Sequence, residues 1–267
     1  MNTMVGSYGS RQPVNIISVW RVWERNFWIY RKRWMYALVP NFFEPVFYLL
    51  GLGLGLGAYV AAGGTFENGY LHFVATGLIA SATMNGAVFE ATYNVFVKLR
   101  FNKTYDAMVA TRVNMEDVVL GEALWATTRA LLYGGVFLFV TLFFGVPLSW
   151  RLLLVIGAVI LTGFCFASIG IAFTAVVPSI DLYSYFFTMF VTPLFLFSDI
   201  FFPVGDRFPD ALVQVAAWTP LYRSVQLIRG LVDGNWAGLW THALYLLMLG
   251  TLLTAFALRR MRNTVIR

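Results

Sequence analysis

The sequence predicts an all-α polytopic membrane protein with six transmembrane helices, an N-terminal interfacial amphipathic helix and two short external re-entrant helices. Of its 267 residues, 59% are hydrophobic and only 12% are charged, whereas soluble domains carry about 25% charged residues. So few charges could not cover the surface of a water-soluble fold. Apolar runs long enough to cross a bilayer recur along the chain. An aromatic content of 18% suits a lipid-facing protein with interfacial belts.

The positive charges are distributed as membrane topology signals. The net charge is +6, but Lys and Arg form short clusters between the apolar runs and do not gather into one patch. This pattern argues against a nucleic-acid partner. The single cysteine, Cys165, lies inside an apolar run. It excludes an intrachain disulfide and a cysteine-based metal site, and we interpret it as a small buried hydrophobe.

Six apolar runs reach the length of about 20 residues that a membrane-spanning helix needs. We expect a cytoplasmic N-terminal segment over 1–35 and a single membrane domain over 36–267. The predicted spans cover residues 36–60, 71–97, 118–145, 152–177, 183–202 and 239–258.

The segment before the first span is charged throughout and lacks the apolar core of a cleavable signal peptide. Its bulky apolar residues recur at helical spacing, with basic residues on the other side. A helix of this kind lies in the membrane interface, although a solvated helix packed on a partner would show the same pattern. The apolar residues are Ile16, Trp20, Trp23, Phe27 and Trp34, and the basic ones are Arg21, Arg25 and Lys32.

The orientation follows from the Lys and Arg counts of the connections. The N-terminal segment holds six, the connection 98–117 holds four and the tail after residue 258 holds four, whereas 61–70 holds none. These three basic segments are therefore expected on the cytoplasmic side. Both termini then lie inside, which requires an even number of spans, and six satisfies this.

The longest external segment is predicted to contain two short helices, within residues 203–234. Residues 208–218 and 221–232 each read as amphipathic helices, with Pro220 between them. Neither is long enough to cross the bilayer, so both are expected to be interfacial or re-entrant.

The glycine run GLGLGLG at 51–57 does not match a phosphate-binding loop, because GxxxxGK[ST] and its strand–turn–helix context are absent. Within an apolar span, glycines four residues apart permit close helix approach. Alternate glycines also weaken a helix. We expect close packing or local unwinding at a helix contact.

Ionisable residues within spans are candidate functional residues. Glu90 and Arg129 are each predicted to lie roughly 12–17 Å from the inner surface, given a rise of about 1.5 Å per residue. Antiparallel neighbours could pair them, which we favour over a proton relay. Glu44, followed by Pro45, could mark a kink or a point on a transport pathway.

The cytoplasmic connection 98–117 can form about two helical turns over 104–111. Asn114 is a predicted N-cap of the third span, with Asp117 at the capping-box position and Glu116 in the first turn. A short rigid helix held between two spans would transmit force from a cytoplasmic partner, although an ordinary tight connection would look similar.

Support for catalysis is weak. His72 and His242 are the only histidines, and each lies at or near a span end. Neither HxxxH nor HExxH occurs. The chain offers no metal site and no evident nucleophile–base pair.

Three stretches resemble the permease subunits of type-2 ATP-binding-cassette exporters, and most closely their NodJ-like lipooligosaccharide branch. Asp199 departs from the family, where a small residue such as glycine is usual, and Tyr222-Arg223 stands where Thr-His is frequent. Both differences lie near the outer exit and leave the cargo open. The resembling stretches are EPVFYLLGLGLGLG (44–57), FEATYNVFVKLRFNKTYDAMVATRVNMEDVVLGEALWATTRA (89–130), and TPLFLFSDIFFPVGDRFPDAL (192–212) followed by PLYRSVQLIRGLVDG (220–234).

The resemblance implies a homodimer of six-span subunits in the bacterial inner membrane, surrounded by lipid. It also implies two copies of a separate P-loop ATPase, which would hold ATP and Mg; the chain itself would need no cofactor. The pathway would run between the subunits, lined mainly by the first, second and fifth spans. The implied coupling residues are Thr104, Tyr105, Asp106, Met108, Val109 and Arg112, and the implied pathway or gate residues are Glu44, Tyr183, Phe187, Phe190, Asp199, Tyr222 and Arg223.

The expected function is that of an exporter permease for an amphipathic cargo, a lipid-linked oligosaccharide or glycolipid. The chain has no nucleotide-binding motif, so we expect a transport subunit and not an enzyme. A drug or antibiotic exporter of the same architecture is the main alternative, followed by an exporter of long polysaccharides. An integral membrane enzyme acting on lipids, a scaffold or a passive channel are alternatives from other classes.

Overall fold

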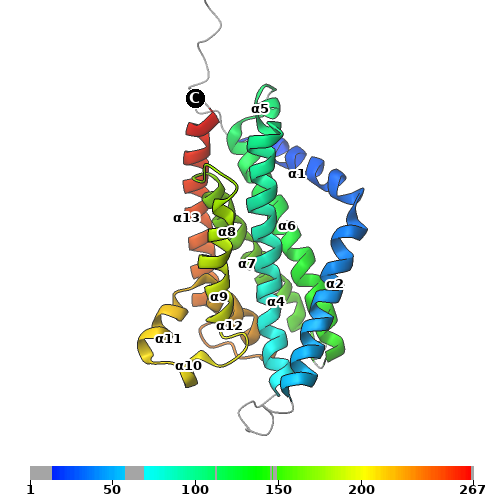
Figure 1. Ribbon diagram of the computed structural model, residues 1–267, viewed down its shortest axis with the longest axis vertical. Helices are drawn as coiled ribbons and strands as arrows, with labels where there is room; N and C mark the ends of the chain where they lie inside the picture. Colours follow the sequence, from blue (N-terminus) through cyan, green and yellow to red (C-terminus); the bar gives the residue numbers. More distant parts are fainter. Residues whose placement is uncertain (1–13, 58–68, 112, 145, 147–148, 266–267) are drawn as a thin grey trace, which may run out of the picture.

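The computed structural model describes residues 14–57, 69–111, 113–144, 146 and 149–265. Within these residues all regular structure is helical, and no strand is present. The long helices run side by side along the long axis of the molecule (Figure 1). The predicted all-α, polytopic fold class is confirmed.

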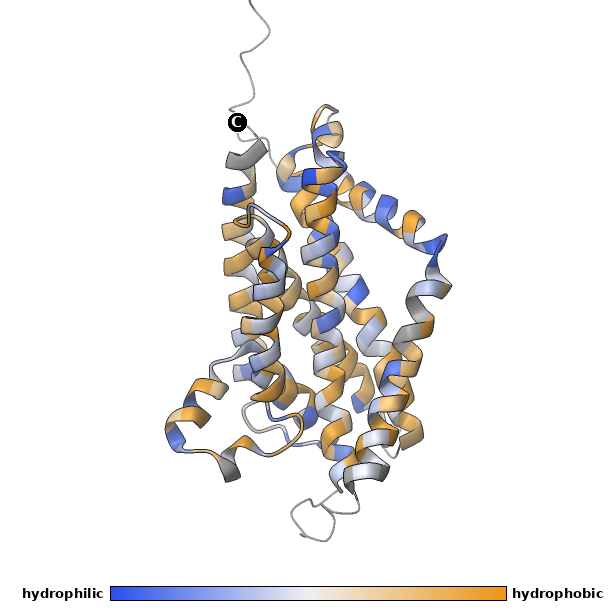
Figure 2. Cartoon of the chain, viewed as in Figure 1, coloured by the Kyte–Doolittle hydropathy of each residue, from blue (hydrophilic) through white to orange (hydrophobic). Residues whose placement is uncertain are grey.

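Four helices are long and apolar enough to cross a membrane, and they correspond to the predicted second, third, fourth and sixth spans. Hydrophobic residues predominate along their shafts (Figure 2). The four are α4 (Tyr70–Phe89) with its π-helical continuations η2 (Glu90–Asn94) and η3 (Val97–Phe101), α6 (Met115–Thr141) with the 3₁₀ turn η4 (Leu142–Phe144), α7 (Arg151–Thr174) and α13 (Leu239–Val265).

The first and fifth predicted spans are shorter helices. The first comprises α2 (Trp34–Leu50) and the π-helical η1 (Gly51–Leu56); residues 58–60 of the prediction lie outside the described residues.

The fifth comprises α8 (Leu182–Phe186), η5 (Phe187–Val191) and α9 (Thr192–Leu196). It ends at Leu196, before the predicted residue 202: Phe197 already leaves helical geometry, with φ −102° and ψ 16°, and Asp199 follows with a φ of 63°. The number of six spans therefore stays a prediction.

The centre of the bundle is formed by α4, α6 and α7, with α13 packed on α7. The buried side of α4 is rich in small residues, which let helix backbones approach closely in a membrane. Lipid tails are as apolar as the side chains, so the hydrophobic effect does not drive helices together in a membrane. Van der Waals contacts between closely packed helices stabilise the bundle instead. The small buried residues of α4 are Ala75, Thr76, Gly77, Ala80, Ser81, Thr83, Gly86 and Ala87.

The N-terminal helix α1 (Ile16–Arg31) lies across the end of the bundle and packs on α6. It buries a face of small and polar residues, including Ser18, Val22 and Asn26. Trp23 is half-buried and donates to Thr128 Oγ1 of α6 at 2.9 Å. Two of its other aromatic residues stay outside, since Trp20 is 53% exposed and Phe27 is 38% exposed. This exposed aromatic surface is available to the membrane interface, as an interfacial helix requires.

Gly121 of α6 is the point at which α1 approaches most tightly. A Cβ atom built there would lie 2.6 Å from Val22 Cβ and 2.9 Å from the Val19 carbonyl oxygen. Val22 is β-branched and 3% exposed, so it has no free space into which it could move. Glycine is therefore the residue that lets α1 lie flat against α6.

We expect Gly121→Ala to destabilise the protein by about 1–3 kcal/mol through overpacking. Gly135→Ala on the same helix is the matched control, because nothing lies within 4 Å of a Cβ there. The control should be neutral or stabilising, since alanine favours helix over glycine. Unfolding by SDS in mixed micelles measures both, and equal behaviour of the two variants would refute the close approach.

The glycine run combines both features expected of it. It forms the π-helical turn η1, a local change of helix winding. Gly53 also faces α4, where a Cβ would lie 2.8 Å from a methyl carbon of Leu71, whereas nothing lies within 4 Å of Gly51 or Gly55. One glycine of the run therefore serves helix packing.

The predicted external segment contains three short helices, α10 (Val204–Arg207), α11 (Asp210–Ala217) and α12 (Pro220–Asp233). They lie at the end of the bundle opposite to α5 (Thr104–Val109) (Figure 1). Helix α12 begins at the Thr219 cap and ends at Gly234, whose φ is 78°. It packs on α4, α7 and α13, and so closes that end of the bundle.

Candidate functional site

The short helix α5 joins the α4 segment to α6 at one end of the bundle. Tyr105 is 1% exposed and anchors α5 to the bundle, whereas Asp106 points outward and is exposed. Thr104, Met108 and Val109 are half-buried. Arg112, also predicted to couple, lies outside the described residues. Helix α5 is therefore anchored to the bundle on the side of Tyr105 and exposed on the side of Asp106.

The start of α6 is held by the predicted capping box. The Asn114 side chain accepts from the backbone of the first turn, and the Asp117 side chain accepts from the Asn114 backbone N–H at 3.2 Å. Asp117 Oδ1 also accepts from the backbone N–H of Asn15 at 2.9 Å. One buried carboxylate therefore fixes the start of α6 and the start of α1 together.

Beneath α5 lies a buried charge cluster of Glu90, Lys98, Glu122 and Arg129. Lys98 Nζ lies 2.8 Å from Glu122 Oε2 and 3.5 Å from Glu90 Oε1. The Glu122 side chain is 1% exposed and that of Glu90 is 7% exposed. Two anions and two cations neutralise one another, which a low-dielectric interior requires.

The cluster brings together the two residues that were predicted to pair. Arg129 Nε lies 3.5 Å from Glu90 Oε2, and the Asn94 amide donates to the same oxygen at 2.7 Å. The Arg129 guanidinium also lies 4.5 Å from the centre of the Tyr30 ring, on α1. The cluster therefore links α1, α6 and the end of the α4 segment.

Tyr105 connects α5 to this cluster. Burial, and secondarily the nearby Glu122 carboxylate, raise the pKa of the Tyr105 hydroxyl well above its usual value, so it stays neutral. Within the described residues, neither this hydroxyl nor Glu122 Oε1 has a hydrogen bond of good geometry. The hydroxyl lies close enough to Glu122 for the carboxylate to influence its pKa.

Sequence reasoning missed Lys98 and Glu122 as members of the cluster. The predicted second span ends at residue 97, whereas the helical segment continues to Phe101 and so includes Lys98. Glu122 lies seven residues before Arg129 and therefore on the same helix face. That spacing, together with the rule that ionisable residues in spans are functional candidates, was the available signal.

A second polar cluster, the outer cluster, lies at the opposite end around Arg229 of α12. Arg229 Nη1 donates to Asp199 Oδ2 at 2.6 Å, and Arg229 Nη2 donates to the carbonyl oxygens of Asp199 at 2.8 Å and Phe73 at 3.0 Å. The guanidinium lies 3.8 Å from the centre of the Phe73 ring. Burial lowers the pKa of Arg229, and the Asp199 carboxylate offsets only part of that effect.

Asp199 receives three kinds of donor in this cluster. Besides Arg229, its carboxylate accepts from the Val204 backbone N–H and from the Gln226 amide, each at 2.8 Å. Its φ of 63° is a conformation that favours glycine and is tolerated by aspartate. Asp199 is therefore accommodated at a backbone conformation that most other side chains would strain.

The other predicted outer residues lie on α12. Arg223 Nη1 lies 3.2 Å from His242 Nδ1, and its guanidinium lies 5.5 Å from the centre of the Tyr245 ring. Tyr222 is half-buried, and burial is the main cause that raises the pKa of its hydroxyl. These contacts fasten α12 to α13, beside the outer cluster.

The predicted pathway residues of the first and fifth spans fall in different surroundings. Tyr183 is fully buried and donates to Thr174 Oγ1 at 2.9 Å. The Phe187 ring stacks on Phe89 at 4.8 Å between centres, and Phe190 is half-buried. Glu44 is exposed on α2. The structure therefore does not gather these residues at one point.

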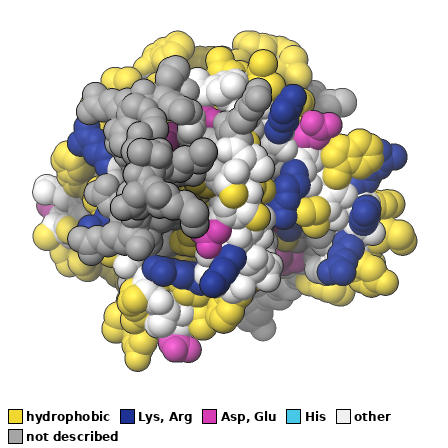
Figure 3. Space-filling view, turned by 90° about the horizontal axis from the view of Figure 1, so that it is seen from above, with side chains coloured by type: hydrophobic (Ala, Val, Ile, Leu, Met, Phe, Trp, Pro, Cys, Tyr) yellow, Lys and Arg dark blue, Asp and Glu magenta, His cyan; other side chains and the backbone are white. Residues whose placement is uncertain are grey.

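The α5 end of the molecule is basic. Seen from this end, Lys and Arg side chains are spread over the described face (Figure 3). In inner-membrane proteins such an excess marks the cytoplasmic side. Among the described residues, no group of three or more His, Cys, Asp or Glu side chains could hold a metal ion.

The bundle of long apolar helices and the anchored helix between two of them define a polytopic membrane protein. The chain belongs to the ABC-2 type transporter family, whose sequence profile matches residues 17–232. It is an integral protein of the bacterial inner membrane and a transport subunit rather than an enzyme.

Within this family the chain is similar to proteins called nodulation protein J. It is 37% identical over 214 residues to that of Rhizobium leguminosarum bv. viciae, covering 80% of this chain and 82% of the relative. Identity to the protein of Sinorhizobium fredii strain NGR234 is 35% over 232 residues, or 86% of each chain. For Rhizobium meliloti it is 33% over 228 residues, covering 85% and 86%.

Proposed function

We propose that this permease works as a homodimer with two copies of a cytoplasmic P-loop ATPase and exports an amphipathic cargo. The supporting observation is the anchored α5, whose buried Tyr105 lies beside Glu122 of the buried charge cluster. A helix docked on an ATPase must pass force to the spans without bending. Burial of Tyr105 anchors α5, and the adjacent cluster joins three other helical segments.

In the proposed mechanism, ATP binding closes the ATPase dimer and pushes on α5 of each subunit. Tyr105 transmits this movement to Glu122, and the charge cluster carries it to α4, α6 and α1. The first and fifth spans then tilt apart between the subunits. ATP and Mg belong to the partner, and both termini of the permease lie in the cytoplasm.

The proposed cargo is a lipid-linked oligosaccharide or glycolipid. Its support is the resemblance along the chain to the NodJ-like branch and the identity of 31–37% to six relatives named nodulation protein J. A drug or antibiotic exporter remains the alternative. Vesicles that contain the complex and fluorescent cargo distinguish the two, since only the proposed cargo should stimulate ATP hydrolysis and cross the bilayer.

The partner is tested by co-purification at native expression level. We expect a stoichiometric P-loop ATPase to accompany the detergent-solubilised permease. A permease that is stable alone and retains no ATPase would overturn the exporter proposal.

Coupling through α5 is tested by Asp106→Ala. Because Asp106 is exposed, its loss should leave the fold intact and weaken only contacts with the ATPase. Loss of one exposed polar contact costs up to about 1 kcal/mol, or about fivefold in affinity. Surface plasmon resonance with the purified ATPase measures the affinity, and stimulated ATP hydrolysis measures the coupling.

Asp210→Ala is the matched control, since Asp210 is an equally exposed aspartate at the opposite end of the bundle. It should leave both readouts unchanged. Met108→Ala is a second test. Because Met108 is half-buried, a melting curve must show that this variant is still folded. Unaltered affinity and coupling in Asp106→Ala and Met108→Ala would show that α5 does not contact the ATPase.

A further inference from the structure

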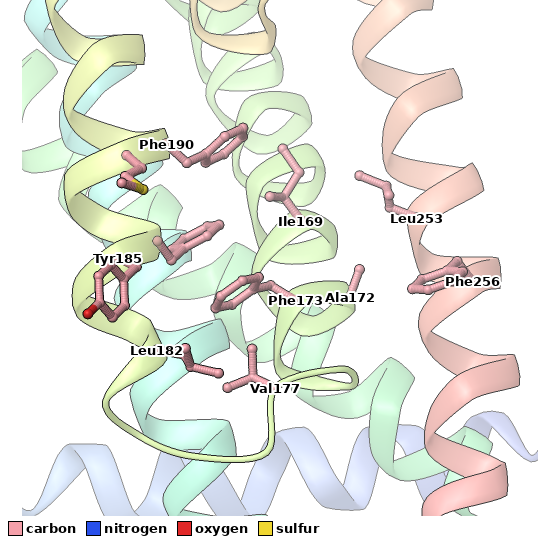
Figure 4. A pocket seen from close by; sticks show the side chains of 11 residues that line it. Ile169, Ala172, Phe173, Val177, Leu182, Tyr185, Phe190, Leu253 and Phe256 are labelled. Atoms are coloured by element: carbon pink, nitrogen blue, oxygen red, sulfur yellow. The ribbon is translucent and has the colours of Figure 1, made fainter.

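An apolar groove opens on the side of the bundle between the fifth segment, α7 and α13. Its volume is about 590 Å³, and none of its eleven lining residues is charged. Side chains of the three elements point into it, with Phe173 and Tyr185 on one side and Leu253 and Phe256 on the other (Figure 4). A volume in the range of about 300–1,000 Å³ accommodates a drug-sized ligand.

The groove lies inside the membrane portion of the protein. Two of its walls, α7 and α13, are helices long and apolar enough to span a bilayer. Met189 is 74% exposed and Phe256 is 47% exposed, so the groove is open toward its surroundings. A ligand that reaches it sideways must therefore be soluble in the lipid phase.

Basic side chains lie just beyond one end of the groove. Arg259 and Arg260 follow Phe256 by three and four residues, which places them one helical turn farther on the same side of α13. Both are exposed. Asp181, also exposed, lies in the connection from α7 to α8, between the lining residues Val177 and Leu182 in sequence. The two arginines make this end of α13 basic.

We propose that this groove binds one acyl chain of an anionic phospholipid of the cytoplasmic leaflet, whose headgroup contacts Arg259 and Arg260. The apolar walls match an acyl chain, and a basic rim at the cytoplasmic end of spans is a site for anionic headgroups. The proposal uses the proposed orientation of the chain but is independent of the ATPase and the cargo.

Lipid fits the groove better than a second copy of the chain does. Helix α2 lies on another side of the bundle from α8, α9 and α13 (Figure 1). Its exposed residues include Phe43 and Phe47, which offer a separate surface for dimerisation. A concave groove with charges only at its rim also matches the shape of a lipid, with one long apolar chain and one charged head.

The proposal is tested by native mass spectrometry of the detergent-solubilised permease with phosphatidylglycerol and phosphatidylcholine of identical acyl chains. The variants are Leu253→Trp, which fills the groove, and Leu252→Trp, its neighbour, which is 65% exposed and does not line the groove. Arg259→Gln with Arg260→Gln tests the rim. Size-exclusion profiles and melting temperatures show that each variant folds, and Met189→Trp at the exposed mouth replaces Leu253→Trp if needed.

We expect retained phosphatidylglycerol in the native protein and in Leu252→Trp, and its loss in Leu253→Trp. Each arginine should contribute about fivefold to the preference for the anionic lipid. Equal retention of both lipids, or unchanged retention in Leu253→Trp, would overturn the proposal. Conversion of dimers to monomers by Leu253→Trp alone would assign the groove to a second copy. An absent ATPase partner would not affect these results.

Discussion

Replacing Glu90 with glutamine is expected to destabilise the protein by about 3 kcal/mol and to reduce cargo-stimulated ATP hydrolysis. Removal of one partner of a buried ion pair leaves an uncompensated buried charge, which costs about 3–5 kcal/mol. Glu90 lies 3.5 Å from both Arg129 and Lys98, so the variant leaves two cations opposite Glu122 alone. Arg129→Gln should have a similar effect, because it leaves the two carboxylates of Glu90 and Glu122 with Lys98 as their cation.

The double variant Glu90→Gln with Arg129→Gln should be less destabilised than the sum of the two single variants, by about 0.5–3 kcal/mol of coupling. Unfolding by SDS in mixed micelles gives these free energies. Arg100→Gln is the control, since Arg100 is exposed at the end of the same helical segment, and its effect should stay within about 0.5 kcal/mol. Strictly additive effects of Glu90 and Arg129 would argue against their direct interaction.

For an isolated pair, exchanging the charges of Glu90 and Arg129 would be the natural rescue experiment. The structure predicts that this exchange rescues only part of the loss. Lys98 Nζ lies 3.5 Å from Glu90 Oε1, so an arginine at position 90 would stand beside another cation. The neutral double variant is therefore the cleaner test.

Arg229→Met is expected to destabilise the outer end of the protein by about 3–5 kcal/mol. The change leaves the Asp199 carboxylate buried with only the Gln226 amide and the Val204 backbone N–H as donors. It also removes the hydrogen bond to the Phe73 carbonyl oxygen, which joins α12 to α4. Thermal unfolding and proteolysis within α10–α12 measure the loss.

Arg223→Met is the matched control on the same helix. Arg223 contacts His242 and the Tyr245 ring, and neither contact involves an acid, so its loss should cost clearly less. Asp199→Gly combined with Arg229→Met should recover part of the stability, because it removes both buried charges and places glycine at a φ of 63°. A double variant as unstable as Arg229→Met would contradict the pairing as the main cause.

Several features of the site were open to sequence reasoning because they depend on local spacing. The capping box at Asn114 and Asp117 and the short helix around Tyr105 follow from residues within one or two turns of one another. The equal depth of Glu90 and Arg129 followed from counting residues along two antiparallel helices. The depth of a residue in the membrane does not reveal how its helix is rotated about its axis, however. Lys98 and Glu122 belong to the cluster because their two helices turn these faces toward one another.

The same reason explains what was missed at the outer end. Asp199 was predicted as a gate residue, but its partner Arg229 is 30 residues away in the sequence and on a different element. The fifth segment ends at Leu196, and Asp199, three residues farther on, has a positive φ and pairs with Arg229. No local sequence pattern predicts an ion pair between residues so far apart in the sequence.

The sequence by itself determined that the chain is an all-α membrane protein and where its long apolar helices lie. Both follow from the length and composition of single segments, because each helix satisfies its own backbone hydrogen bonds and needs only an apolar run to cross a bilayer. Only the tertiary structure decided which face of α1 is buried, which charges meet beneath α5 and how the fifth segment ends. Those outcomes depend on how each helix is rotated and packed against its neighbours, and the close contacts that fix this join residues far apart along the chain.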